Sequence, residues 1–184
     1  MQREMKKTQF IKGIGVTPGI IIGKAYLLDR GKLEVPARVI PEFHIPQEVA
    51  RFRDAVEESK KQLRQAKDKL LQEEATGLTY ILDTHLLLLE DKNLIENTLE
   101  TIKQSWINSE WALKINLERL RKIFNNIDDE YLKSRKTDID YIGERILRNL
   151  LGQDKDAIPQ IKDEVIIVSH DLSPADTAQM VKGK

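Results

Sequence analysis

The feature that most constrains the fold is a long central stretch in which apolar residues recur at helical spacing. Charged Lys, Arg and Glu residues separate the apolar ones, which begin as Val49, Phe52, Val56, Leu63 and Leu70. This spacing places the apolar side chains on one face of a helix and the charged side chains on the other. Gly77 has low helix propensity, so we predict a break near residues 75–77.

The same pattern continues to residue 152 and predicts further helices. We predict one helix over residues 79–89 and another over residues 94–104. A longer stretch begins at residue 108 or 109, where Asn or Ser can cap a helix, and ends at Gly152, where a left-handed C-cap is expected. The turn-prone segment 125–129 can bend or split this stretch. Long helices with short connections can bury their apolar faces against one another as a bundle.

Strand-like segments lie on both sides of the helical stretch. Between Phe10 and Leu28, β-branched residues and glycines surround a turn at residues 17–19, which predicts two short strands. Residues 164–169 (Glu-Val-Ile-Ile-Val-Ser) predict a third, buried strand. A helix is expected to follow, because Ser173 can cap it, Pro174 suits its first position and Asp176 can complete a capping box.

These patterns together predict a mainly α protein. A helical bundle over residues 36–152 is inserted into a small, incomplete α/β domain, which residues 1–35 and 153–184 provide; three short strands make only a thin sheet. On periodicity alone, a coiled-coil or spacer protein fits the central stretch as well as a bundle does. The flanking strands and the absence of sustained heptads favour the inserted bundle.

Charge and composition exclude several classes of function. The 184 residues include 30 basic and 30 acidic side chains, so no overall positive field attracts nucleic acid or an anionic membrane. The absence of cysteine excludes a disulfide scaffold, a Cys-ligated metal site and thiol catalysis. The first ten residues are charged and polar, without the apolar core of a signal sequence, so we do not expect secretion, and the longest apolar runs are too short to span a bilayer. We therefore expect a cytoplasmic protein without membrane insertion.

The glycines near the N-terminus invite comparison with a phosphate-binding loop. They lie between Gly13 and Gly23, but Lys24 is followed by alanine and not by the hydroxyl residue that would bind magnesium. A strand-like segment follows instead of a helix N-terminus, so turn and close-packing roles are favoured. No set of histidines or carboxylates has the spacing of metal ligands.

The three histidines differ in their predicted surroundings. His44 lies in a connector flanked by prolines and is expected to be a solvated loop residue. His85 lies on a predicted helix, where packing or contact with a partner is favoured over catalysis because no base or metal ligand lies one turn away. His170 ends the predicted strand, a position where active sites often form, but it has no glycine-rich approach to a phosphate.

Four motifs in order make the chain resemble the N-terminal part of Enzyme I, the phosphoenolpyruvate–protein phosphotransferase of bacterial sugar uptake. The motifs are Gly13-Ile-Gly-Val-Thr-Pro-Gly19, His85-Leu-Leu-Leu-Leu-Glu-Asp91, the pair Asp128–Lys133 and Ile142–Gly152, and the pair Asp163–Val168 and Asp171–Gln179. The resemblance implies a helical domain that docks the phosphocarrier protein HPr, inserted in an α/β phosphohistidine (swivelling) domain. It also implies a parent with a C-terminal domain that binds phosphoenolpyruvate and Mg²⁺.

The resemblance further implies which residues contact HPr. These are His85, Leu88, Leu94, Phe124, Leu132 and Arg135, with Leu88 and Leu94 as an apolar anchor and Arg135 as an orienting charge. Thr177 matches a threonine that hydrogen-bonds the family's phosphorylated histidine. The Gly-Gly-x-Thr-Ser-His segment that carries this histidine in the family does not occur in the sequence. We therefore expect a chain without catalytic activity or a cofactor of its own.

Two other interpretations remain open from the sequence. A helical spacer or interaction module would leave no exposed apolar patch around Leu88 and Leu94. A swivelling domain from a relative such as pyruvate phosphate dikinase would not bind HPr. An incomplete sheet also exposes strand edges, so a homodimer is possible.

Overall fold

The computed structural model describes residues 8, 10–12, 18–28, 33–72, 79–126, 130–153, 163–178 and 180; for residues 130–135 it describes the backbone only. The elements are, in chain order, strand β1 (Lys24–Leu28), 3-10 helix η1 (Glu42–His44), helices α1 (Ile45–Gln72), α2 (Thr79–Leu88), α3 (Lys92–Ser105), α4 (Ser109–Asn125) and α5 (Glu130–Leu151), strand β2 (Val165–Ser169) and helix α6 (Pro174–Thr177). The mainly α fold class is confirmed.

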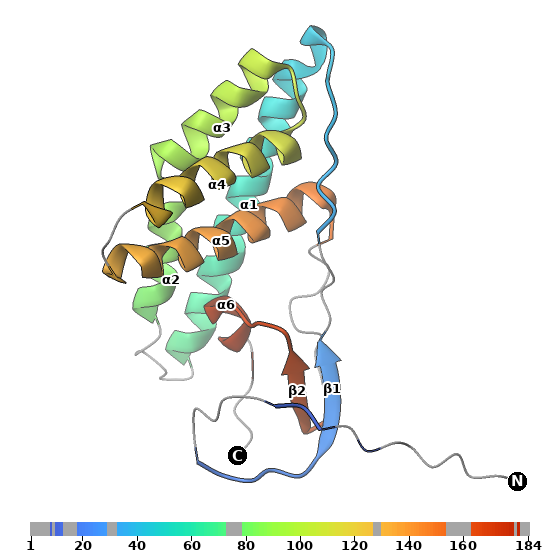
Figure 1. Cartoon of the computed structure of the whole chain (residues 1–184), viewed down its shortest axis with the longest axis vertical. Coiled ribbons are helices and arrows are strands. Elements are labelled where there is room, and N and C mark those ends of the chain that lie inside the picture. Colours follow the sequence, from blue (N-terminus) through green and yellow to red (C-terminus); the bar gives the residue numbers. More distant parts are fainter. Residues whose placement is uncertain are drawn as a thin grey trace, which may run out of the picture.

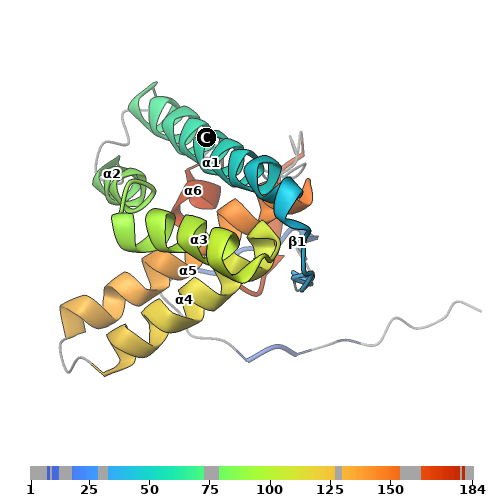
Figure 2. The same ribbon diagram turned by 90° about the horizontal axis from the view of Figure 1, so that it is seen from above.

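Helices α1 to α5 pack into a bundle around one apolar core (Figure 1). The long helix α1 contacts each of the other four, because its apolar face continues over its whole length. The predicted inner-face residues Phe52, Val56, Leu63 and Leu70 are all buried. The short helix α6 lies at the lower end of the bundle in Figure 1, so it is seen between α1 and α3 in the view from above (Figure 2), and it contacts α1 and α2.

The ends of the helices follow local capping chemistry. Helix α3 begins at Lys92, two residues before its predicted start, because the Asp91 carboxylate accepts hydrogen bonds from the backbone amides of residues 93 and 94. Helix α4 ends at Asn125 and α5 begins at Glu130, so the long predicted stretch is split as its turn-prone segment indicated. Gly152 has a φ of 64° and forms the predicted left-handed C-cap of α5.

The two strands form a parallel pair below the bundle (Figure 1). Lys24 pairs with Val165 and Leu28 pairs with Ser169, so a strand that precedes the bundle in the sequence lies beside one that follows it. Two strands were predicted between Phe10 and Leu28, but within the described part of that segment only β1 is a strand. Residues 13–17, which include the first residue of the predicted turn, lie outside the described residues, as does the predicted break at 75–77.

Helix α6 connects the strand pair to the bundle core. The hydroxyl of Ser173 accepts a hydrogen bond from the amide of Asp176, and the Asp176 carboxylate accepts one from the amide of Ser173, which confirms the predicted capping box. Ala175 and Ala178 are buried in the same core as the long helices. The end of β2 is therefore held close to the bundle.

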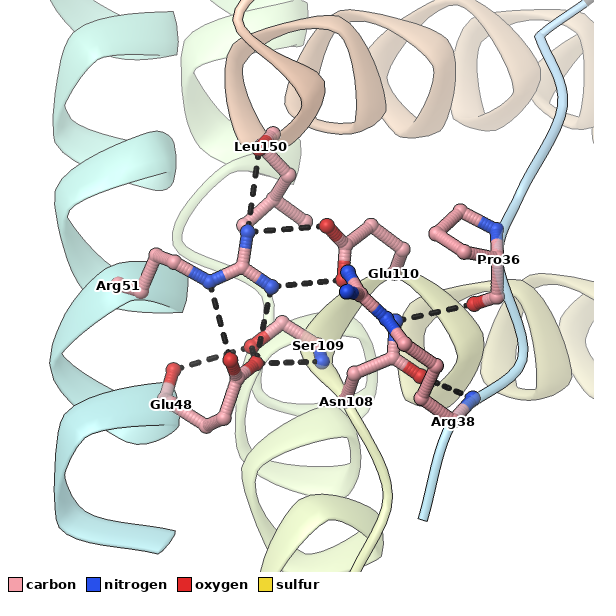
Figure 3. Close-up of polar contacts among 8 residues, drawn as sticks. All are labelled: Pro36, Arg38, Glu48, Arg51, Asn108, Ser109, Glu110 and Leu150. Atoms are coloured by element: carbon pink, nitrogen blue, oxygen red, sulfur yellow. Dashed lines mark hydrogen bonds and ion pairs between the residues drawn. The ribbon is translucent and has the colours of Figure 1, made fainter. Parts of the chain in front are cut away.

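A partly buried ion cluster holds three helices together at the other end of the bundle (Figure 3). Arg51 of α1 donates to both oxygens of Glu48, both oxygens of Glu110 on α4, and the carbonyl of Leu150 at the end of α5, at 2.7–3.1 Å. All five donor positions of the guanidinium are used. The amide and hydroxyl of Ser109 complete the cluster by donating to Glu48 at 2.8 Å.

Asn108 attaches the connector that precedes α1 to this cluster (Figure 3). Its side chain donates to Glu110 at 2.7 Å and to the carbonyl of Pro36 at 2.9 Å, and accepts from the amide of Arg38 at 2.9 Å. Burial raises the pKa values of Glu48 and Glu110, but their hydrogen bonds, those from Arg51 foremost, outweigh it, so both pKa values lie below the ordinary 4.5. The cluster is therefore ionised over the neutral pH range.

Among the helices that the structure describes, none combines the length and the apolar character needed to cross a lipid bilayer.

Candidate docking site

Helix α2 has one face in the core and one face in solvent. Leu82, His85 and Leu88 recur at a spacing of three and are buried. Tyr80 and Leu87 are seven residues apart, which is close to two helical turns, so they lie on the same face. They are 65% and 69% exposed. Large apolar side chains at that exposure give α2 a surface suited to contact with another protein.

His85 contributes to the structure from the inner face of α2. Its ring is buried, and its Nε2 lies 3.2 Å from the Oδ1 of Asp138 on α5, so the Nε2–H tautomer can donate to this carboxylate. Burial lowers the pKa of His85 below its ordinary value of 6.5, and the attraction of Asp138 offsets only part of that effect. The histidine is therefore neutral at pH 7 and joins α2 to α5.

The ring of Tyr141 on α5 connects His85 to the segment after β2. The two ring centroids are 6.4 Å apart, with the planes inclined by 45°. The Tyr141 hydroxyl donates a hydrogen bond of 2.9 Å to the Oδ2 of Asp171. Partial burial and this hydrogen bond raise the pKa of Tyr141 to about 12, so the hydroxyl keeps its proton and acts as the donor. Asp171 also accepts from the amide of Leu172 at 2.8 Å.

The two leucines predicted as the apolar anchor lie in the core. Leu88 is 8% exposed and Leu94 is 2% exposed, because each belongs to the inner face of its helix. Asn116 of α4 fixes this region further by donating to the carbonyls of Asn93 and Leu94, at 2.8 and 3.0 Å. In this structure, neither leucine can serve as an exposed anchor. The exposed apolar side chain next to Leu88 in the sequence is Leu87.

The other predicted site residues are partly outside what the structure describes. Phe124 is half-buried against the core at the end of α4. The side chains of Leu132 and Arg135 lie outside the described residues. Thr177 is exposed, and its hydroxyl donates to the carbonyl of Pro174 within α6.

The other two histidines lie at the surface, and the described residues form no metal site. His44 and His170 are both exposed, one beside α1 and one at the end of β2. Within the described ranges, no group of three or more His, Cys, Asp or Glu side chains is arranged to hold a metal ion.

Sequence reasoning missed Leu87 and Tyr141. The run of four leucines at residues 86–89 has no periodicity of its own, so it does not show which leucine faces solvent. The spacing of Leu82, His85 and Leu88 carries that signal, because it defines the inner face of α2. No sequence pattern indicated the contact of Tyr141 with Asp171, which are 30 positions apart.

Comparison with known protein families identifies the class of protein to which this chain belongs. Residues 12–135 match the family model described as PEP-utilising enzyme, N-terminal. The chain belongs to this family.

Among individual proteins, this chain is similar in sequence to phosphoenolpyruvate-protein phosphotransferases. The chain is 38% identical over 172 residues to the protein of that name from Bacillus subtilis (strain 168), covering 94% of this chain and 30% of the relative. It is 34% identical over 170 residues to that of Haemophilus influenzae, covering 92% and 30%. The chain thus spans about a third of the length of these curated relatives.

Solved structures support the same likeness. A solution structure of an Enzyme I protein matches with a TM-score of 0.76 at 34% identity, covering 89% of this chain and 66% of that one. The N-terminal domain of a nitrogen-type Enzyme 1 has the same fold, with a TM-score of 0.61 at 23% identity and coverage of 90% and 67%. The resemblance drawn from the four sequence motifs is confirmed.

Proposed function

We propose that the helical bundle of this chain docks the phosphocarrier protein HPr, as part of a phosphoenolpyruvate–protein phosphotransferase that supplies sugar uptake. The family membership supports the parent activity, and the exposed apolar face of α2 carries the docking proposal. In the parent, a C-terminal domain binds phosphoenolpyruvate and Mg²⁺, and the phosphoryl group passes through a histidine to HPr. This chain supplies the recognition surface.

The docking surface that we propose is centred on Leu87, with Tyr80 beside it on the same face of α2. An exposed leucine that becomes buried against a partner contributes through the removal of apolar surface from water. Leu88 and Leu94 support this surface from beneath, because they fill the core under α2 and α3. His85 supports it in the same way through its contact with Asp138.

Two observations favour this proposal over the alternatives. A spacer module without enzymatic ancestry does not account for the family match over residues 12–135. The curated relatives named above are protein phosphotransferases, which favours a protein acceptor over the small-molecule chemistry of a pyruvate phosphate dikinase.

The test is a titration of isotope-labelled HPr with the chain, followed by NMR. We expect HPr resonances around its active-site histidine to shift. Leu87→Ala should weaken binding about tenfold, since truncation of an interface anchor typically costs about 1–3 kcal/mol. Leu27→Ala is the matched control, because Leu27 is also 69% exposed but lies on β1. An HPr spectrum that stays unchanged at millimolar concentration of the wild-type chain would refute docking.

A further inference from the structure

The region between α2, α5 and the end of β2 holds a connected set of polar and aromatic contacts. His85 on α2 contacts Asp138 and the ring of Tyr141, both on α5. The Tyr141 hydroxyl then reaches Asp171 in the loop that leads to α6. The set therefore extends from the helix that carries the proposed docking surface to the strand pair.

The loop at Asp171 is built so that one hydrogen bond can set its position. Asp171 accepts from the amide of Leu172, and its own carbonyl accepts from the hydroxyl of Ser169, at 2.8 and 2.7 Å. The capping box of Ser173 and Asp176 follows at once. The Tyr141 hydroxyl holds this compact turn against α5, while Ala175 and Ala178 anchor α6 in the core.

We propose that Tyr141 is a positioning residue that couples the docking helix α2 to the loop at the end of β2. Its ring contacts the buried side of α2 through His85, and its hydroxyl orients Asp171. Binding of a carrier protein to the exposed side of α2 then restrains the loop, and an ordered loop favours binding in return. This inference rests on the docking function proposed above.

The geometry explains why a tyrosine suits this role. The residue must reach from a helix in the bundle to a solvent-exposed carboxylate while its ring stays against another ring. Phenylalanine keeps the ring contact but has no donor for Asp171. The raised pKa of Tyr141 agrees with a hydroxyl that stays protonated as a donor. Tyr141→Phe therefore removes one hydrogen bond and changes little else.

Hydrogen exchange on the free chain tests the first half of the coupling. The amides of Ser173 and Thr177 are informative because they donate to Asp176 and to the carbonyl of Ser173. In Tyr141→Phe, these amides should exchange about twofold to tenfold faster, as loss of one hydrogen bond of ordinary strength predicts. Tyr26→Phe on β1 is the matched control, and in this variant the Ser173 and Thr177 amides should exchange at the wild-type rate.

Hydrogen exchange in the presence of HPr tests the second half of the coupling, namely that binding at α2 restrains the loop. HPr should slow exchange of the Ser173 and Thr177 amides in the wild-type chain, and Tyr141→Phe should abolish that response. Because linkage is reciprocal, the factor by which HPr suppresses opening of the loop equals the factor by which the ordered loop binds HPr more tightly than the open loop does. A merely structural role for Tyr141 would change the free-state exchange rates but leave the slowing by HPr intact.

The outcomes separate this inference from the docking function. If HPr binds the wild-type chain but leaves loop exchange unchanged, or if Tyr141→Phe keeps the full response, the coupling is refuted while docking stands. If HPr does not bind the wild-type chain, docking and coupling both fail. An Asp171→Ala variant tests whether Tyr141→Phe acts through Asp171. If it does, the Ser173 and Thr177 amides of the double variant should exchange no faster than those of Asp171→Ala alone.

Discussion

At the scale of single residues, burial assigns different roles to neighbours in the run 85–89. His85 and Leu88 face the core, whereas Leu87 faces solvent. A one-residue step along a helix turns the side chain by about 100°. Adjacent leucines of the same chemistry can therefore belong to the core and to a docking surface. The same logic explains why Leu94, in the first turn of α3, is a core residue.

The buried His85 makes the stability of the bundle depend on pH. Its pKa in the folded state lies below the unfolded value of about 6.5, so the unfolded chain binds the proton more readily. The free energy of unfolding should therefore fall as pH decreases below about 6.5, by at most about 1.4 kcal/mol per pH unit. Chemical denaturation at a series of pH values measures this.

A His85→Gln variant should flatten that dependence, because the Gln amide can still donate to Asp138 but does not titrate. His44→Gln is the control, since His44 is exposed, and it should keep the wild-type curve. An identical slope in wild type and His85→Gln between pH 7 and 5 would contradict the prediction. The lowered pKa values of Glu48 and Glu110 act in a separate window, with their stabilisation lost below about pH 4.5.

At the scale of elements, the Arg51 cluster determines how the helix ends meet. It joins α1, α4 and the Leu150 carbonyl in the last turn of α5, and Asn108 adds the connector before α1. The carbonyls at the end of a helix have no partner within that helix, so Arg51 satisfies one that α5 leaves open. A bidentate guanidinium fixes distances and angles that apolar packing would leave loose.

Removal of this arginine should destabilise the bundle. Arg51→Met keeps an unbranched stem but leaves the buried carboxylate of Glu110 without its cation, which should cost about 3 kcal/mol. The midpoint of urea denaturation measures the loss. Arg119→Met is the matched control on α4, and because Arg119 is exposed it should stay within about 0.5 kcal/mol of wild type. A similarly small effect of Arg51→Met would show that the cluster adds nothing to stability.

At the scale of the whole molecule, the bundle and the strand pair differ in how much of their apolar surface they cover. Phe52, Leu63, Leu113, Ile142 and Ile146 are fully buried among the helices. In contrast, Ile20, Ile21, Ile22 and Leu27 around β1 are exposed. A two-stranded sheet contributes little independent stability. The helices should therefore fold without the strands.

A fragment of residues 46–152 should form a cooperative helical bundle on its own. Circular dichroism should show high helicity and a single sigmoidal melt, because the apolar faces of α1 to α5 cover one another. The melting temperature should lie slightly below that of the full chain, since the fragment loses the contacts of α6 with α1 and α2. A broad, gradual melt, or helicity that returns only with residues 163–178 present, would disprove independent folding.

The sequence by itself determined the elements, because their signals are local. The helical spacing of Phe52 and Val56, the capping box at Ser173 and the C-cap at Gly152 each depend on residues within a few positions of one another. The family motifs are contiguous for the same reason. They identified the protein class, although they did not show which leucines face solvent.

Only the tertiary structure decided which side chains from distant elements meet. The parallel pairing of β1 with β2, the Arg51 contacts with Glu110 and the Tyr141 contact with Asp171 join residues from 30 to about 140 positions apart. No local propensity encodes such pairs, because their geometry follows from the packing of whole helices. The burial of Leu94 and the exposure of Leu87 follow from the same packing, since a helix acquires an inside and an outside only when it has neighbours.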